Sequence, residues 1–128
     1  MQTIEVNHKT MANLLKKSVE KSWMDDNRDA WFQFTDGSAV CIHVIENNWN
    51  TYIAVDNLDS NTPVSFHDEQ GIMGYADTKG KPRAYTDRTL SINFDKARYY
   101  YHCAFGYATR QYIPVAEFHY YEKGESWE

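Results

Sequence analysis

The sequence has 128 residues, a length typical of one folded domain, with 16% aromatic residues and a formal net charge of −5. This acidic balance argues against a duplex DNA-binding protein, because such proteins usually carry a net basic domain. The chain has two cysteines, Cys41 and Cys103, and its first residues lack the apolar stretch of a signal peptide. We therefore expect reduced thiols, a cytoplasmic location and no membrane partner.

Charge is distributed unevenly along the chain. Residues 9–23 hold four lysines against one glutamate, whereas residues 24–70 hold nine acidic residues against Arg28 alone. A surface with this asymmetry could steer a charged partner, although opposite patches can also neutralise each other after folding.

Residues 11–23 have the spacing of an amphipathic helix. Met11, Leu14, Leu15 and Val19 recur on one helical face, and the Thr10 hydroxyl can cap the first turn. The sequence thus predicts an N-terminal helix that packs its apolar face on the rest of the domain.

Residues 30–46 carry the signals of a β-hairpin. Two β-rich runs flank Asp36-Gly37, a pair that tolerates the positive φ angles of a two-residue turn. This turn places Thr35 opposite Ser38, and both faces of the hairpin are then largely apolar. We expect one face to be covered by the helix and the other by loops, another helix or a partner chain, which makes a homodimer a further expectation.

The downstream sequence predicts more strands. Residues 51–57 and 115–121 are the clearer ones, and 63–68, 71–76 and 90–94 are weaker. Residues 96–112 fit a helix capped by Asp95 or a strand with an aromatic face, and the three consecutive tyrosines favour the strand. The predicted fold is one α+β domain, residues 1–128, with an N-terminal amphipathic helix packed on a mainly antiparallel sheet built around the 30–46 hairpin and a second helix at 96–112 as an alternative.

Two weak signals for metal chemistry occur. Cys41, His43, His102 and Cys103 are zinc-ligand types, but their spacing does not match a known zinc motif, so buried thiols and ordinary histidines are the simpler interpretation. Asp77 and Lys79, with Asp68 nine residues before Asp77, form an isolated acid-and-lysine set of the kind that metal-dependent nucleases use. We assign no catalytic residue, metal or cofactor, and an enzyme without a readable motif stays an alternative.

A basic stretch with aromatic residues predicts an alternative nucleotide site. It contains Lys79, Lys81, Arg83, Tyr85 and Arg88 within residues 75–101. Basic groups hold phosphate and tyrosine rings stack on bases, so a small nucleotide or a short single strand is a candidate ligand.

The preferred prediction is a protein-binding surface around Trp49. This tryptophan lies in a polar loop near Glu46, Tyr52, Asp56 and Asp59, and Trp and Tyr are enriched in binding hot spots. The sequence therefore predicts a small acidic intracellular protein that blocks or modulates a macromolecular partner through aromatic anchors and an acidic rim. Inhibitors of the immunity or phage anti-defence type work this way, and the expected partner is a basic nucleic-acid-handling protein.

Overall fold

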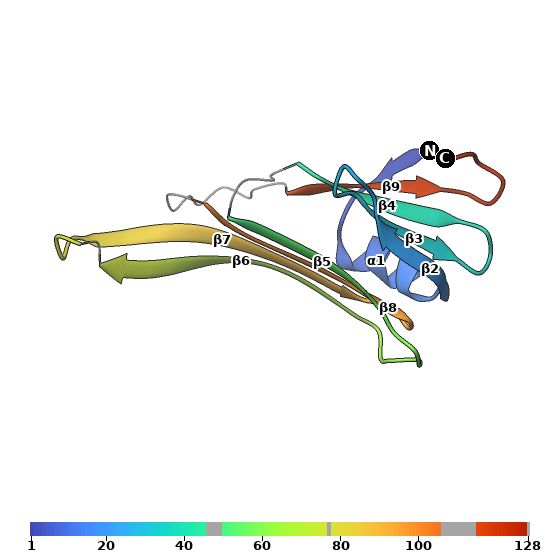
Figure 1. Cartoon of the computed structure of the whole chain (residues 1–128), viewed down its shortest axis with the longest axis horizontal. Helices are drawn as coiled ribbons and strands as arrows, with labels where there is room; N and C mark the ends of the chain where they lie inside the picture. The colour runs from blue at the N-terminus through green and yellow to red at the C-terminus, as the bar shows by residue number, and fades with distance from the viewer. Residues whose placement is uncertain (46–49, 77, 106–114, 128) are drawn as a thin grey trace.

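The chain forms two antiparallel β-sheets that pack face to face (Figure 1). This computed structural model describes residues 1–45, 50–76, 78–105 and 115–127, and for residues 72–76, 82–85 and 105 it describes the backbone alone. The described elements, in chain order, are β1 (Gln2–Ile4), α1 (His8–Leu15), β2 (Val19–Met24), β3 (Ala30–Phe34), β4 (Ala39–Val44), β5 (Thr51–Asn57), β6 (Ser65–Ala76), β7 (Pro82–Asn93), β8 (Ala97–Phe105) and β9 (Ala116–Tyr121).

The strands divide into a five-stranded sheet, in the order β1-β9-β4-β3-β2, and a four-stranded sheet, in the order β5-β8-β7-β6. Aromatic rings connect the two inner faces: Phe32 lies 4.7 Å from Phe94 and 6.3 Å from Tyr99, measured between ring centroids. Phe32, Phe94 and Tyr99 are each at most 1% exposed. The aromatic residues thus supply much of the core that the low aliphatic content leaves unfilled.

The predicted α+β fold is wrong, because the described part of the chain is mostly β-strand with one short helix. That helix ends at Leu15, and residues 19–24 instead form β2, which pairs with β3. Asn7 rather than Thr10 is the N-cap, and its side-chain oxygen accepts from the Thr10 amide at 2.9 Å. Met11 and Leu14 are buried as the helical spacing predicted.

The predicted hairpin at 30–46 exists as β3 and β4, but its register differs by one residue. Gln33 pairs with Ala39, and the Phe34 amide donates to the Ser38 carbonyl at 2.8 Å, so the loop has three residues. Gly37, with φ of 90°, takes the left-handed position that closes such a loop. The shift turns Ala30, Phe32, Phe34, Val40 and Ile42 to one face, where all are fully buried.

At 96–112 the strand that the tyrosines favour is confirmed, and the alternative helix is wrong, over the residues that can be compared. Residues 97–105 form β8, which pairs with β5 and β7, while residues 106–112 lie outside the described part. Asp95 lies in the turn before β8, where its carboxylate accepts from the Ser18 hydroxyl at 2.6 Å and from the Val19 amide at 3.0 Å. It therefore ties the start of β2 to the four-stranded sheet instead of capping a helix.

The remaining strand predictions are confirmed in position. Residues 51–57 form β5, 90–94 lie largely in β7, and 115–121 match β9 to within one residue. The two strands expected at 63–68 and 71–76 are a single strand, β6, which begins at Ser65. β7 pairs with β8 from Thr86 to Asn93, whereas β6 and β7 pair out to Ala76 and Pro82. This hairpin of β6 and β7 therefore extends as an arm beyond the described end of β8 (Figure 1).

Among the described residues, no helix combines the length and apolar character needed to cross a membrane.

Candidate functional site

Three tryptophans gather on the outer face of the five-stranded sheet. Trp23 on β2 lies directly opposite Trp31 on β3, and their rings are 6.1 Å apart and nearly parallel. Trp127 lies 5.5 Å from Trp23 and 5.3 Å from Trp31. We call Trp23, Trp31 and Trp127 the tryptophan cluster; all three rings are partly exposed.

The strand alternation and one turn explain how the cluster forms. On β3, the inward residues Ala30, Phe32 and Phe34 alternate with Trp31, which therefore points away from the core. Trp127 reaches the same face from the segment after β9, where Gly124 has φ of 89°. This left-handed glycine lets the backbone turn within a few residues.

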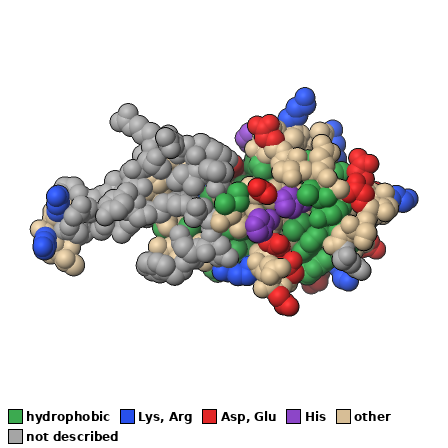
Figure 2. All heavy atoms as spheres, turned by 90° about the horizontal axis from the view of Figure 1, so that it is seen from above, with side chains coloured by type: hydrophobic (Ala, Val, Ile, Leu, Met, Phe, Trp, Pro, Cys, Tyr) green, Lys and Arg blue, Asp and Glu red, His purple; other side chains and the backbone are tan. Residues whose placement is uncertain are grey.

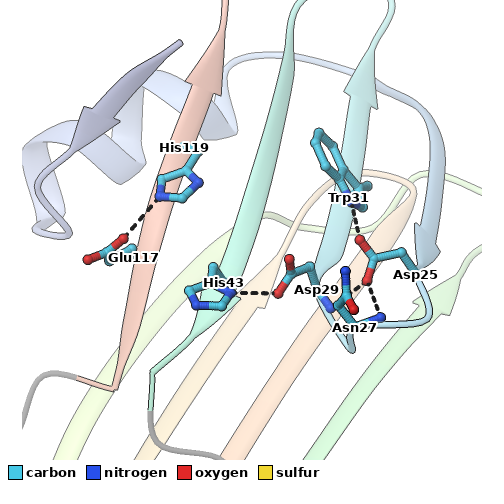
Figure 3. A network of polar contacts seen from close by, with 7 residues as sticks. All are labelled: Asp25, Asn27, Asp29, Trp31, His43, Glu117 and His119. Atoms are coloured by element: carbon cyan, nitrogen blue, oxygen red, sulfur yellow. Dashed lines mark hydrogen bonds and ion pairs between the residues drawn. The ribbon is translucent and has the colours of Figure 1, made fainter. Parts of the chain in front are cut away.

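Asp25 anchors the polar side of the cluster. The Trp31 Nε1–H donates to its carboxylate at 2.9 Å, and the backbone amides of Asn27 and Asp29 donate to the same carboxylate at 2.9 and 3.0 Å (Figure 3). Burial raises the pKa of Asp25, but these hydrogen bonds outweigh it, so the pKa lies below its ordinary value of 3.8. A negative charge is thus fixed beside the indole of Trp31.

Two histidine–carboxylate pairs continue this face toward β9. His43 Nδ1 lies 2.8 Å from Asp29 and His119 Nε2 lies 3.1 Å from Glu117, and the two imidazole rings are roughly parallel at 6.4 Å (Figure 3). The space-filling view shows histidine, acidic and hydrophobic side chains mixed on the surface of the two-layer body (Figure 2). The cluster is therefore bordered by imidazole and carboxylate groups that can form hydrogen bonds with a partner.

A shallow hollow of about 470 Å³ lies over the cluster. It is lined by Lys21, Trp23, Asp25, Trp31, Gln33 and Trp127. The Lys21 ammonium lies 5.6 Å from the centroid of the Trp23 ring, within the range of a cation–π interaction. The hollow thus combines three indole rings with one cation, one carboxylate and one amide.

Cys41 lies on the same face as Trp31 but is only 3% exposed. Burial, and then the nearby carboxylates of Asp29 and Asp25, raise the pKa of its thiol to about 12. The thiol is therefore protonated at neutral pH, which is the opposite of what a nucleophilic cysteine needs.

The predicted partner-binding residues are only partly described, and the described ones lie away from the tryptophan cluster. Glu46 and Trp49 fall outside the described residues. Tyr52 is 60% exposed on β5, its ring 5.9 Å from that of Tyr100, while Asp56 at the end of β5 and Asp59 in the next turn are exposed too. Tyr52 and Asp56 point outward from the four-stranded sheet, on the opposite side of the molecule from the tryptophan cluster.

The predicted nucleotide-site residues are not brought together as a set. Lys79 and Lys81 are exposed at the end of the arm, where Figure 2 shows basic side chains. The side chains of Arg83 and Tyr85 lie outside the described part. Arg88 is 1% exposed and donates through Nε and Nη2 to the two carboxylate oxygens of Asp68 at 2.7 and 2.8 Å.

The residues considered for metal chemistry are also separated. Cys41 and His43 belong to the five-stranded sheet, whereas His102 and Cys103 belong to the four-stranded one. Across the described residues, no three His, Cys, Asp or Glu side chains are placed to share a metal ion. Of the acid-and-lysine set, Asp68 is paired with Arg88 and Asp77 is outside the described part.

A second hollow, of about 450 Å³, opens between the two sheets near β9 and β6. Its walls include Phe66, Leu90 and Phe118 together with the Asp68–Arg88 pair. Since this pair already satisfies its charges internally, the hollow offers a mainly apolar surface and a less defined chemistry than the cluster does.

Sequence reasoning missed the tryptophan cluster because residues 19–23 were assigned to a helix. With 19–24 read as a strand, the polar run 25–29 becomes a hairpin loop and Trp23 and Trp31 become cross-strand neighbours.

Comparison with known proteins found no matching family model, no similar curated protein and no similar solved structure.

Proposed function

We propose that this protein binds a macromolecular partner through the tryptophan cluster and thereby blocks or modulates that partner. The observation that supports the proposal is the gathering of Trp23, Trp31 and Trp127 on one outer sheet face. Partly exposed tryptophans bury a large area on binding and have few rotamers to freeze, which is why they dominate binding hot spots.

The chemistry beside the cluster favours binding over covalent catalysis. Cys41, the nearest thiol on this face, is buried and has its pKa raised to about 12. The other polar groups, Asp25, His43 and His119, form hydrogen-bonded pairs that hold fixed positions at the border of the cluster. Fixed polar groups around exposed rings give a binding surface its specificity.

Charge favours a basic partner. Asp25, Asp29 and Glu117 lie on or beside this face, and the whole chain has a formal net charge of −5. A basic protein that handles nucleic acid has the complementary surface, and long-range attraction would speed its association. The proposal keeps the function that the sequence predicts, with Trp23, Trp31 and Trp127 as the main anchors in place of Trp49.

The test compares matched variants on the two outer faces. The protein is immobilised and used to capture partners from a cell lysate, with Trp31→Ala and Trp127→Ala on one face and Tyr52→Ala and Asp56→Lys on the other. We expect both tryptophan variants to lose the captured protein, because truncating a hot-spot ring costs about 2 kcal/mol or more of binding free energy. The two β5 variants should retain it.

Circular dichroism of each variant separates loss of binding from loss of fold, and Trp127 serves this purpose best because it lies in the segment after β9. Capture that survives both tryptophan substitutions but fails in Tyr52→Ala would reject the cluster. It would return the partner surface to Tyr52, Asp56 and Asp59.

A further inference from the structure

We infer that the tryptophan cluster recognises a cationic group, namely the ammonium or guanidinium of a lysine or arginine on the partner. The inference rests on the proposed function and specifies the chemistry of the same site. It assigns the indole faces of Trp23, Trp31 and Trp127 as the binding platform and Asp25 as the counter-ion.

The indole rings provide the first part of the argument. Indole has the most favourable face for cation–π attraction among the aromatic side chains, and an arrangement of several rings is the usual way to hold an ammonium group. Here three indoles lie within 6.1 Å of one another, around a hollow of about 470 Å³. This volume leaves room for a cationic head group beside the rings.

A cation already occupies part of this site. The Lys21 ammonium lies 5.6 Å from the Trp23 centroid, on the same outer face. Lys21 and Trp23 are two residues apart on β2, which brings both side chains to the same side of the strand. The chain's own lysine therefore places an ammonium group within cation–π range of this ring.

Asp25 provides the negative charge. Its carboxylate accepts from Trp31 Nε1 at 2.9 Å, and its pKa lies below 3.8, so it is ionised at neutral pH. Asp29, which pairs with His43, adds a second carboxylate in the same loop. A cation over the rings would thus gain a counter-ion at the border of the hollow, whereas a neutral ligand of the same shape would not.

This arrangement predicts opposite effects for two neighbouring residues. Lys21 competes with an incoming cation, so removing its charge should strengthen binding. Asp25 attracts the cation, so removing its charge should weaken binding. A hollow that bound its ligand by apolar surface burial alone would show neither the stronger binding on removal of the Lys21 charge nor the weaker binding on removal of the Asp25 charge.

The experiment uses choline and its neutral carbon isostere, 3,3-dimethylbutan-1-ol, which differ at the central atom and hence in charge. Binding is followed through the indole N–H signals of the four tryptophans in a proton–nitrogen correlation spectrum. We expect choline to shift the signals of Trp23, Trp31 and Trp127 at a concentration about ten-fold lower than the isostere needs.

Three variants complete the test. Asp25→Asn removes the charge and keeps one side-chain oxygen acceptor where the carboxylate offers two, one to Trp31 and one to the Asn27 and Asp29 amides. It should weaken choline binding about five-fold, while Lys21→Gln, which removes the charge without adding apolar surface, should strengthen it. Tyr52→Leu, on the other sheet, should leave it unchanged. Equal binding of choline and the isostere, or no effect of Asp25→Asn, would overturn the cation site.

The outcome also separates this inference from the function on which it rests. Absence of choline binding, together with partner capture that still requires Trp31 and Trp127, would reject the cation while leaving the binding surface in place. Loss of cluster dependence in the capture experiment would reject the proposed function itself, whatever choline does.

Discussion

The Arg88 side chain lies inside the protein, where its guanidinium makes a two-point contact with the Asp68 carboxylate. From the sequence, Arg88 belongs to a basic run that suits phosphate binding. Burial could not be inferred from that run, because it depends on the β6–β7 register, which places Arg88 and Asp68 on the inner face of the four-stranded sheet. A buried charge of this kind requires its partner.

Removing that partner should therefore be costly. We expect Asp68→Ala to lower the free energy of unfolding by about 3 kcal/mol, because it removes the carboxylate that makes the two-point contact with the buried Arg88 guanidinium. The double variant Asp68→Leu with Arg88→Met should be clearly more stable than the single variant, since no charge then remains inside. Urea unfolding of the three proteins measures both quantities, and a double variant weaker than Asp68→Ala contradicts this account.

The cysteines illustrate what the sequence does predict at this scale. Their interpretation as small buried hydrophobic residues agrees with exposures of 3% for Cys41 and 0% for Cys103. The prediction succeeds because cysteine is among the residues most often buried, a preference that needs no knowledge of the fold.

At the scale of single elements, strands could be located from the sequence, but their register and the end of the helix could not. Alternation and β-branched or aromatic content mark β5 and β9 correctly. The apolar spacing of Met11, Leu14 and Val19 fits a longer helix equally well, and only pairing with β3 makes residues 19–24 a strand. Such pairing is a tertiary effect that local preference cannot supply.

The β3–β4 loop shows how one residue decides a register. Asp36-Gly37 is compatible with a two-residue turn and with the observed three-residue loop, and the second choice buries Phe32 and Phe34 on the same face as Val40 and Ile42. The core selects between the turns, because a slip of one residue would move one of these sets to the outer face.

Gly37 should consequently resist substitution by residues that avoid positive φ. We expect Gly37→Ala to destabilise the protein by about 1 kcal/mol, since alanine is strained in the left-handed region. A Cβ there would also approach Lys123 Cγ to 3.1 Å. Gly37→Asn is the matched control, because asparagine tolerates this conformation better. Thermal unfolding should rank glycine above asparagine above alanine, and equal stability of all three would contradict the proposed loop geometry.

At the scale of the whole molecule, the two outer faces differ in character. One carries the tryptophan cluster with its carboxylates, and the other carries the exposed Tyr52 and Tyr100. The sequence could indicate a surplus of aromatic residues, but not which face each would reach, because that depends on how the nine described strands share two sheets.

The homodimer stays a prediction, and the tyrosine face suits it. Tyr52 and Tyr100 contact each other, and the cross-strand neighbours Asp56 and Arg98 beside them are exposed with opposite charges, so two copies related by a two-fold axis would present complementary groups. We expect light scattering to give twice the chain mass of 15.0 kDa for the unaltered protein. Tyr52→Ser with Tyr100→Ser should return it to one chain mass, and a single chain mass without any substitution would exclude the dimer.

The order of strands in the five-stranded sheet also has a kinetic consequence. Strand β9 lies between β1 and β4, so Gln2 pairs with Tyr120 and Val40 pairs with the same residue from the other side. On the ribosome, β4 cannot acquire this neighbour until residues 116–121 have emerged. Closing so long a loop is entropically slow, and folding of such non-local β topologies takes milliseconds to seconds. During that interval the edge of β4 lacks the strand that pairs with it, and an unpaired strand edge is prone to aggregation, which makes the nascent chain a natural client for chaperones.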